Sequence, residues 1–193
     1  MSWESLGDVG TAPRARPAPA AQLVLDFARP AARWRFSRLV ARSRHFARIV
    51  TRIERVRAHF PELDDISIRV GLAQKRGVLG WGSLDPDQPG IWIRQRRLEL
   101  FTIAHEMTHL LQARGLIPRG ERACDLHALA RSAAIVDAAP SYLKIPAALR
   151  TRPLAPAVAA LLHLAARESL AARAAGDRRY LKRFEAVIER AVE

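Results

Sequence analysis

The stretch RRLELFTIAHEMTHLLQAR, residues 96–114, decides the fold that we expect for this chain. Its pattern is that of a helix, and Gly115 follows at the position where a glycine commonly ends one. Within it, residues 105–109 read His-Glu-Met-Thr-His. Side chains four positions apart lie on one face of a helix, so His105 and His109 can point at a common centre. The sequence therefore predicts a helix that presents two imidazoles together.

Two histidines at this spacing are typical of a zinc site. Glu106 follows the first histidine directly, so it flanks the metal without being a ligand. From there its carboxylate can take a proton from water and later deliver it to a leaving amine. We therefore predict a zinc-dependent peptidase, with His105 and His109 as metal ligands and Glu106 as the catalytic carboxylate.

A catalytic zinc needs a third protein ligand, and four candidates lie just downstream. Glu121 and Asp125 are four positions apart and share a helix face, whereas His127 lies about 200° around the helix from Asp125. This geometry favours Glu121 as the third ligand, with Asp125 hydrogen-bonded to a ligand imidazole. The alternative is a ligand from Cys124 or His127, and His127 is the main rival.

The segments around this helix predict an α+β fold. Residues 34–60 carry a helical pattern with one apolar stripe and one face dense in arginine. Three strand-like segments follow, at 66–70, 77–82 and 91–93. We interpret them as a small antiparallel sheet, or a hairpin plus one strand, packed on the helix that carries His105. Further helices are expected at both ends of the chain.

Downstream, a second helix is expected over 121–137 and a proline-interrupted loop with a short helix over 138–153. The pattern from 155 to 192 is helical with a break near Gly176. The predicted organisation is a flexible tail at 1–30, a catalytic domain at 31–137, and a helical extension at 138–193 packed on the same domain.

Composition and charge indicate which partners and which location to expect. The formal net charge is +13, which favours polyanionic partners, and nucleic acid could bind the arginine-rich helix 34–60. A solvated charged face would explain the same pattern. Cys124 is the single cysteine, so no disulfide can form within the chain. We find no secretory signal pattern and no apolar run long enough to span a membrane, so we expect a cytoplasmic protein.

HEMTH at 105–109, followed by Glu121 and Asp125 in an ExxxD helix, resembles the gluzincin metallopeptidases, which include thermolysin-like enzymes. The compact order of elements is similar to the minimal forms called minigluzincins, and also to the SprT-like DNA-associated proteases. The resemblance covers about residues 35–137. It implies a zincin-like fold, a bound Zn²⁺ and a polypeptide substrate. SprT-like enzymes use a histidine as third ligand, which would give that role to His127.

The gluzincin resemblance also implies that substrate lies extended along the edge strand above the active-site helix. Here that strand would fall at 78–84, which includes Trp81, Gly82 and Ser83. Such enzymes have a downstream histidine or tyrosine that polarises the oxyanion, and Tyr142 is the candidate for this role. Ordinary packing is the alternative interpretation of Trp81.

Overall fold

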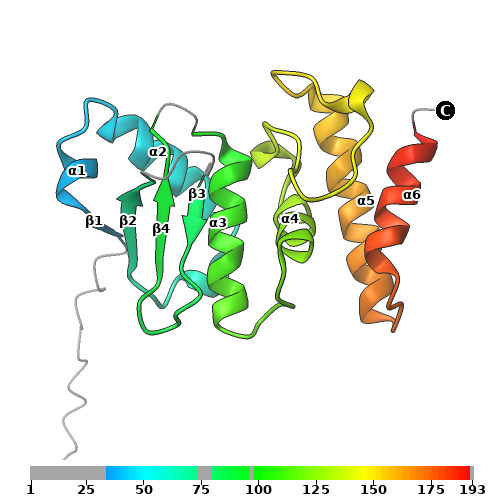
Figure 1. Ribbon diagram of the computed structural model, residues 1–193, viewed down its shortest axis with the longest axis horizontal. Helices are drawn as coiled ribbons and strands as arrows, with labels where there is room; N and C mark the ends of the chain where they lie inside the picture. Colours follow the sequence, from blue (N-terminus) through cyan, green and yellow to red (C-terminus); the bar gives the residue numbers. More distant parts are fainter. Residues whose placement is uncertain (1–33, 74–79, 96–97, 192–193) are drawn as a thin grey trace, which may run out of the picture.

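A computed structural model describes residues 34–73, 80–95 and 98–191. A four-stranded sheet lies at one end, α3 stands between the sheet and α4, and two helices pair at the far end (Figure 1). The elements in chain order are β1 (Trp34–Phe36), α1 (Arg38–Ala41), α2 (Phe46–Arg57), β2 (Ile68–Leu72), β3 (Gly80–Gly82), β4 (Gly90–Ile93), α3 (Leu100–Ala113), α4 (Glu121–Leu129), α5 (Pro156–Ala174) and α6 (Tyr180–Arg190). Short 3₁₀ helices occur at Pro61–Leu63, Ala133–Ile135 and Ala147–Leu149. The tail predicted at 1–30 lies outside the described residues.

The α+β class is confirmed, but the sheet is not antiparallel as predicted. Its order is β1-β2-β4-β3, with β1, β2 and β4 parallel and only β3 antiparallel to β4. The prediction failed because strand direction depends on the connections. Parallel neighbours require a long crossover, and α1 and α2 supply one between β1 and β2.

The predicted helix at 34–60 was wrong at its start. Trp34–Phe36 is a strand that pairs with Ile68–Val70, and Arg42–His45 separates α1 from α2. Three residues are too few to show a period of their own, so the neighbouring helical pattern absorbed them. Without β1, the sequence offered no sign of the crossover that makes the sheet parallel.

One face of the sheet supports the site. The alternate residues Ile68, Val70, Ile91 and Ile93 are fully buried and belong to one core with apolar residues of α2 and α3. Gly80 and Gly82 of β3 point the same way and lie against α3. This strand is at the edge of the sheet, directly beside the helix with the two histidines (Figure 1).

The N-terminus of α3 is held by a carboxylate from a distant segment. The two oxygens of Asp137 accept the backbone N–H groups of Leu100, at 2.9 Å, and Phe101, at 3.1 Å. Negative charge is stabilising at this end of a helix. Asp137 lies beyond the end of α4, because the helix predicted at 121–137 stops at Leu129. Ser132 then caps a short 3₁₀ helix by accepting from the N–H of Ala134.

The C-terminal helices follow the predicted pattern. Gly176, with φ of 97°, stands in the break between α5 and α6, a left-handed conformation that suits glycine. Leu162 of α5 and Phe184 of α6 are fully buried in the same core as the residues of α3. Among the described residues, no helix is both long and apolar enough to cross a membrane.

Candidate metal centre

The two histidines lie on a helix that is buried around its whole circumference. Every residue of α3 from Leu100 to Gln112 is buried, and the exposed fractions of His105, Glu106 and His109 are 8%, 4% and 9%. Burial of polar side chains is unfavourable unless they have partners. The arrangement of those partners therefore shows what the site is built for.

One ring nitrogen of each histidine is already bonded. Nδ1 of His105 donates to Asp125 of α4 across 2.7 Å, and Nδ1 of His109 lies 2.8 Å from Oε1 of Gln112. The amide of Gln112 is itself fixed by donating to the carbonyls of Pro118 and Gly120. Both rings are thus oriented through Nδ1, so that Nε2 is the atom on each ring that could bind a metal ion.

The two Nε2 atoms converge on one carboxylate oxygen. Oε2 of Glu121 lies 3.0 Å from Nε2 of His105 and 3.4 Å from Nε2 of His109. Ligand atoms around a tetrahedral ion with bonds of about 2.0–2.1 Å lie roughly 3.3 Å apart, so both distances suit zinc. Two imidazoles and one carboxylate, with a fourth position open, are typical of a catalytic zinc site.

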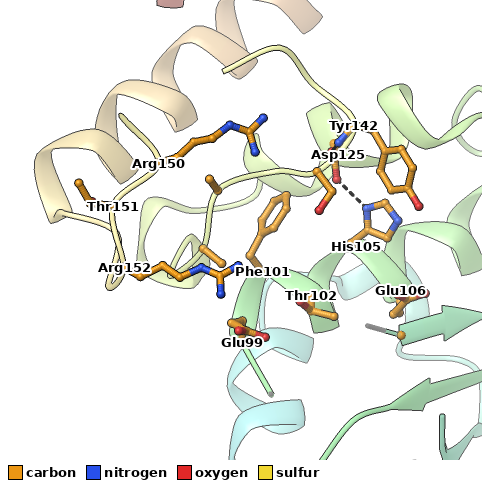
Figure 2. Close-up of a pocket in the computed structure, with 14 residues that line it drawn as sticks. Glu99, Phe101, Thr102, His105, Glu106, Asp125, Tyr142, Arg150, Thr151 and Arg152 are labelled. Carbon is orange, nitrogen blue, oxygen red and sulfur yellow. Dashed lines mark hydrogen bonds and ion pairs between the residues drawn. The ribbon is translucent and has the colours of Figure 1, made fainter. Parts of the chain in front are cut away.

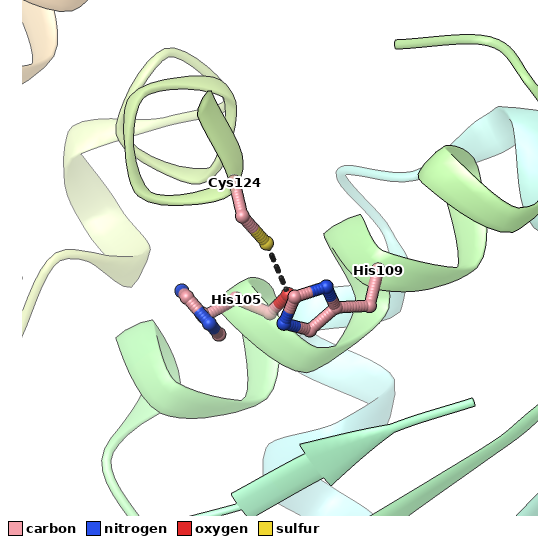
Figure 3. A group of neighbouring side chains, drawn as sticks. All are labelled: His105, His109 and Cys124. Atoms are coloured by element: carbon pink, nitrogen blue, oxygen red, sulfur yellow. Dashed lines mark hydrogen bonds between the residues drawn. The ribbon is translucent and has the colours of Figure 1, made fainter. Parts of the chain in front are cut away.

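His105, His109 and Cys124 also form a group that could hold a metal ion, with one ligand atom from each lying within 4.8 Å of the others. Figure 3 shows the thiol of Cys124 above α3, directed at the backbone of His105. Its Sγ donates to the carbonyl oxygen of His105 at 3.0 Å. The thiol therefore donates to the backbone, whereas the carboxylate of Glu121 lies between Nε2 of His105 and Nε2 of His109. For this reason we favour Glu121 over Cys124.

Asp125 combines two tasks. Its Oδ1 accepts from His105, and its Oδ2 accepts the backbone N–H of Tyr142 at 2.7 Å. Burial favours the neutral imidazole, but the bond and charge of Asp125 outweigh it and raise the pKa of His105. Asp125 thus sets the ring of His105 and also holds the loop that follows α4 against the site.

Glu106 lies beneath the edge strand. Burial raises the pKa of its carboxyl group to about 7, although the charge of His105 acts in the opposite direction. A Cβ atom added to Gly80 would lie 2.4 Å from Oε1 of Glu106, and one on Gly82 would lie 2.6 Å from the carbonyl oxygen of Glu106. Both glycines are therefore needed for the close approach of β3 to α3.

Tyr142 comes to the site although it is 37 positions from His105 in the sequence. The two rings stack with centroids 5.6 Å apart and an interplanar angle of 18°. Both residues line a cavity of about 550 Å³, which extends from Glu106 to the loop of Arg150–Arg152 (Figure 2). The cavity therefore lies beside His105 and Glu106.

His127, the rival ligand, lies in a different environment. Its Nε2 is buried and has no hydrogen-bond partner among the residues that the structure describes, and burial, with the charges of Arg173 and Arg131, lowers its pKa to about 4. Its electrostatic neighbours are thus Arg173 of α5 and Arg131, rather than the metal centre.

The residues that sequence reasoning missed are Gln112 and Gly80. Gln112 stands three positions after His109 on the same helix face, a spacing that could have revealed it.

Some arginines of the segment 34–60 already form contacts within the protein. Arg52 contacts the carbonyl oxygen of Leu98 and Asp137, Arg55 donates to the carbonyl of Ala134, and Arg57 is buried. Binding of nucleic acid by this segment stays a prediction. Comparison with models of known protein families, with curated proteins and with solved structures finds no match.

Proposed function

We propose that the protein is a zinc-dependent peptidase. The observation that carries this proposal is the convergence of Nε2 of His105 and Nε2 of His109 on one oxygen of Glu121. These three side chains would hold the ion. Bound there, zinc supplies a Lewis acid that polarises a carbonyl group and activates water at neutral pH.

The roles of the protein groups follow from their positions. Glu106 adjoins His105 and lines the cavity, so its carboxylate accepts a proton from water and returns it to the departing amine. Asp125 fixes the ring of His105. Tyr142 stands beside the same ring, where its hydroxyl is available to a developing oxyanion.

The choice of a polypeptide substrate is supported by β3. Within the described part of the chain this strand pairs with β4 alone, and it adjoins both Glu106 and the cavity. An extended peptide can add to such an edge through backbone hydrogen bonds, which would lay a peptide bond across the metal centre.

The proposal is tested by digestion of a mixed peptide library with the purified full-length protein. We expect cleavage that is abolished by a chelator, restored by zinc, and reduced about 10²–10⁴-fold in Glu106→Gln. Glu106→Gln should keep its zinc, because Glu106 is not a ligand. Cleavage that persists without metal, or in Glu106→Gln at the wild-type rate, would refute the mechanism. Zinc binding with no cleavage of any peptide would refute the peptidase assignment alone.

A further inference from the structure

The face of the sheet opposite α3 carries two arginines, on β1 and β2, and two tryptophans, on β4 and β3. Arg35 of β1 pairs with Arg69 of β2, and Trp81 of β3 pairs with Trp92 of β4. Gly71, two positions after Arg69, is the partner of Trp92 across the parallel pair. Side chains at paired positions of neighbouring strands point to the same side. All four side chains therefore share one face, which we call the outer face.

The tryptophans form a stacked pair that rests on glycine. A Cβ atom added to Gly71 would lie 2.3 Å from Cδ1 of Trp92, and one on Gly90 would lie 2.9 Å from its Cη2. The indole thus lies flat over two strands, where no larger residue would leave room. The ring of Trp81 stacks on it with centroids 4.3 Å apart, and Trp81 is 55% exposed. A large aromatic surface is presented to solvent.

The arginines continue this surface. The Cβ atom added to Gly90, which would lie 2.9 Å from Cη2 of Trp92, would also lie 3.3 Å from Cβ of Arg69. Arg69 therefore adjoins the indole of Trp92. Arg35 and Arg69 are exposed, and among the described residues neither forms an ion pair with a carboxylate. With strands about 4.8 Å apart, the surface from Arg35 to Trp81 extends roughly 14 Å across the sheet.

We propose that the outer face binds a single-stranded nucleic acid. Its bases stack on Trp81, and its phosphates contact Arg69 and Arg35. Aromatic rings beside unpaired basic groups are the combination that single strands require, since every base has a π face and every link a negative charge. The charge of the chain, +13, complements such a ligand. A duplex keeps its bases stacked internally and cannot use Trp81 in this way.

This proposal is independent of the hydrolase. The same strand β3 nevertheless links the two, because Trp81 points outward while Gly80 and Gly82 face Glu106. A nucleic acid on the outer face would therefore be separated from the metal centre by the thickness of β3. Proteins bound to that nucleic acid would be brought near the site.

The test is fluorescence anisotropy with a labelled oligothymidylate and the full chain. Stacking contributes about 1–3 kcal/mol per base, so Trp81→Ala should weaken binding by roughly 5- to 150-fold. Trp81→Phe should retain most of the affinity. Leu164→Ala, which removes a side chain of similar exposure (56%) on α5, is the control and should bind as wild type does. Arg69→Gln should flatten the dependence of log affinity on log salt by about 0.7.

Four results would overturn the proposal. They are no binding by the wild type, wild-type affinity in Trp81→Ala, an equal affinity for the corresponding duplex, and competition by an acidic peptide that itself depends on Trp81. The last result would assign the outer face to a protein segment. If thermal unfolding shows that Trp81→Ala is destabilised, the proposal is tested with Trp81→Phe and Arg69→Gln instead. A salt dependence in Arg69→Gln equal to that of the wild type contradicts the phosphate contact.

Discussion

Nδ1 of His105 lies 2.7 Å from the carboxylate of Asp125, so that the helix bearing the histidines and the helix bearing Glu121 are joined at the site itself. This bond fixes the ring and directs Nε2 toward Oε2 of Glu121. Asp125→Asn should therefore weaken zinc binding by about 10–100-fold. Competition with a chromophoric chelator measures the effect, with Asp177→Asn, near the break between α5 and α6, as the control. Equal zinc affinities for the two variants would show that Asp125 does not position the ligand.

The choice of third ligand is decided by the zinc content of three variants. Glu121→Ala should lose most of its zinc, since the carboxylate oxygen between the two imidazoles is removed. Cys124→Ser keeps a donor for the carbonyl of His105 and should retain zinc, as should His127→Ala. Elemental analysis after dialysis provides the measurement. Retention in Glu121→Ala together with loss in Cys124→Ser would transfer the ligand role to the cysteine.

Gly80 and Gly82 should respond differently to alanine. At Gly80 the new methyl group meets the side chain of Glu106, which can move, so the fold survives while the carboxylate is displaced. A displacement of about 1 Å commonly costs about a hundredfold in rate. At Gly82 it meets the backbone of Glu106 and should destabilise the fold by about 1–3 kcal/mol. Peptide cleavage and thermal unfolding of both variants check this, and a fully active Gly80→Ala would contradict it.

Tyr142→Phe isolates the hydroxyl group. Phenylalanine preserves the ring that stacks on His105, so zinc content and KM should stay near their wild-type values. If the hydroxyl stabilises the oxyanion, kcat should fall by about a hundredfold. Steady-state kinetics on a cleaved peptide supply the readout. An unchanged kcat would leave Tyr142 with packing alone.

His127 should make the fold sensitive to acid. Its pKa is lowered from 6.5 to about 4 in the folded protein, so between these values the unfolded chain binds the proton more strongly. Above about pH 6.5 the histidine is neutral in both states and the free energy of unfolding keeps its full value. As the pH falls from 6.5 toward 4, protonation of the unfolded chain lowers that free energy. Between pH 7 and pH 5 the free energy of unfolding should therefore decrease by about 1 kcal/mol less in His127→Leu than in the wild type. This figure allows for the partial exposure of His127. Urea unfolding in the presence of chelator tests this, and parallel pH profiles would refute it.

The helix of residues 100–113 and the pairing of His105 with His109 could be predicted because they depend on local geometry. A residue and its fourth neighbour share a face wherever the helix lies. The end of the helix was equally local, since Gly115 adopts the positive φ, 71°, that glycine favours. The expected partnership of Asp125 with an imidazole also followed from its spacing, although the particular imidazole, His105, did not.

By itself, then, the sequence determined the α+β class, the helix with its two histidines and Glu106, and a second helix carrying Glu121 and Asp125. Only the tertiary structure decided the parallel sheet, the approach of β3 to Glu106, and which downstream side chain faces both Nε2 atoms. The physical reason is the range of the interactions. Helical periodicity acts over four residues, whereas the direction of a strand and the rotation of α4 against α3 depend on contacts between distant segments of the chain.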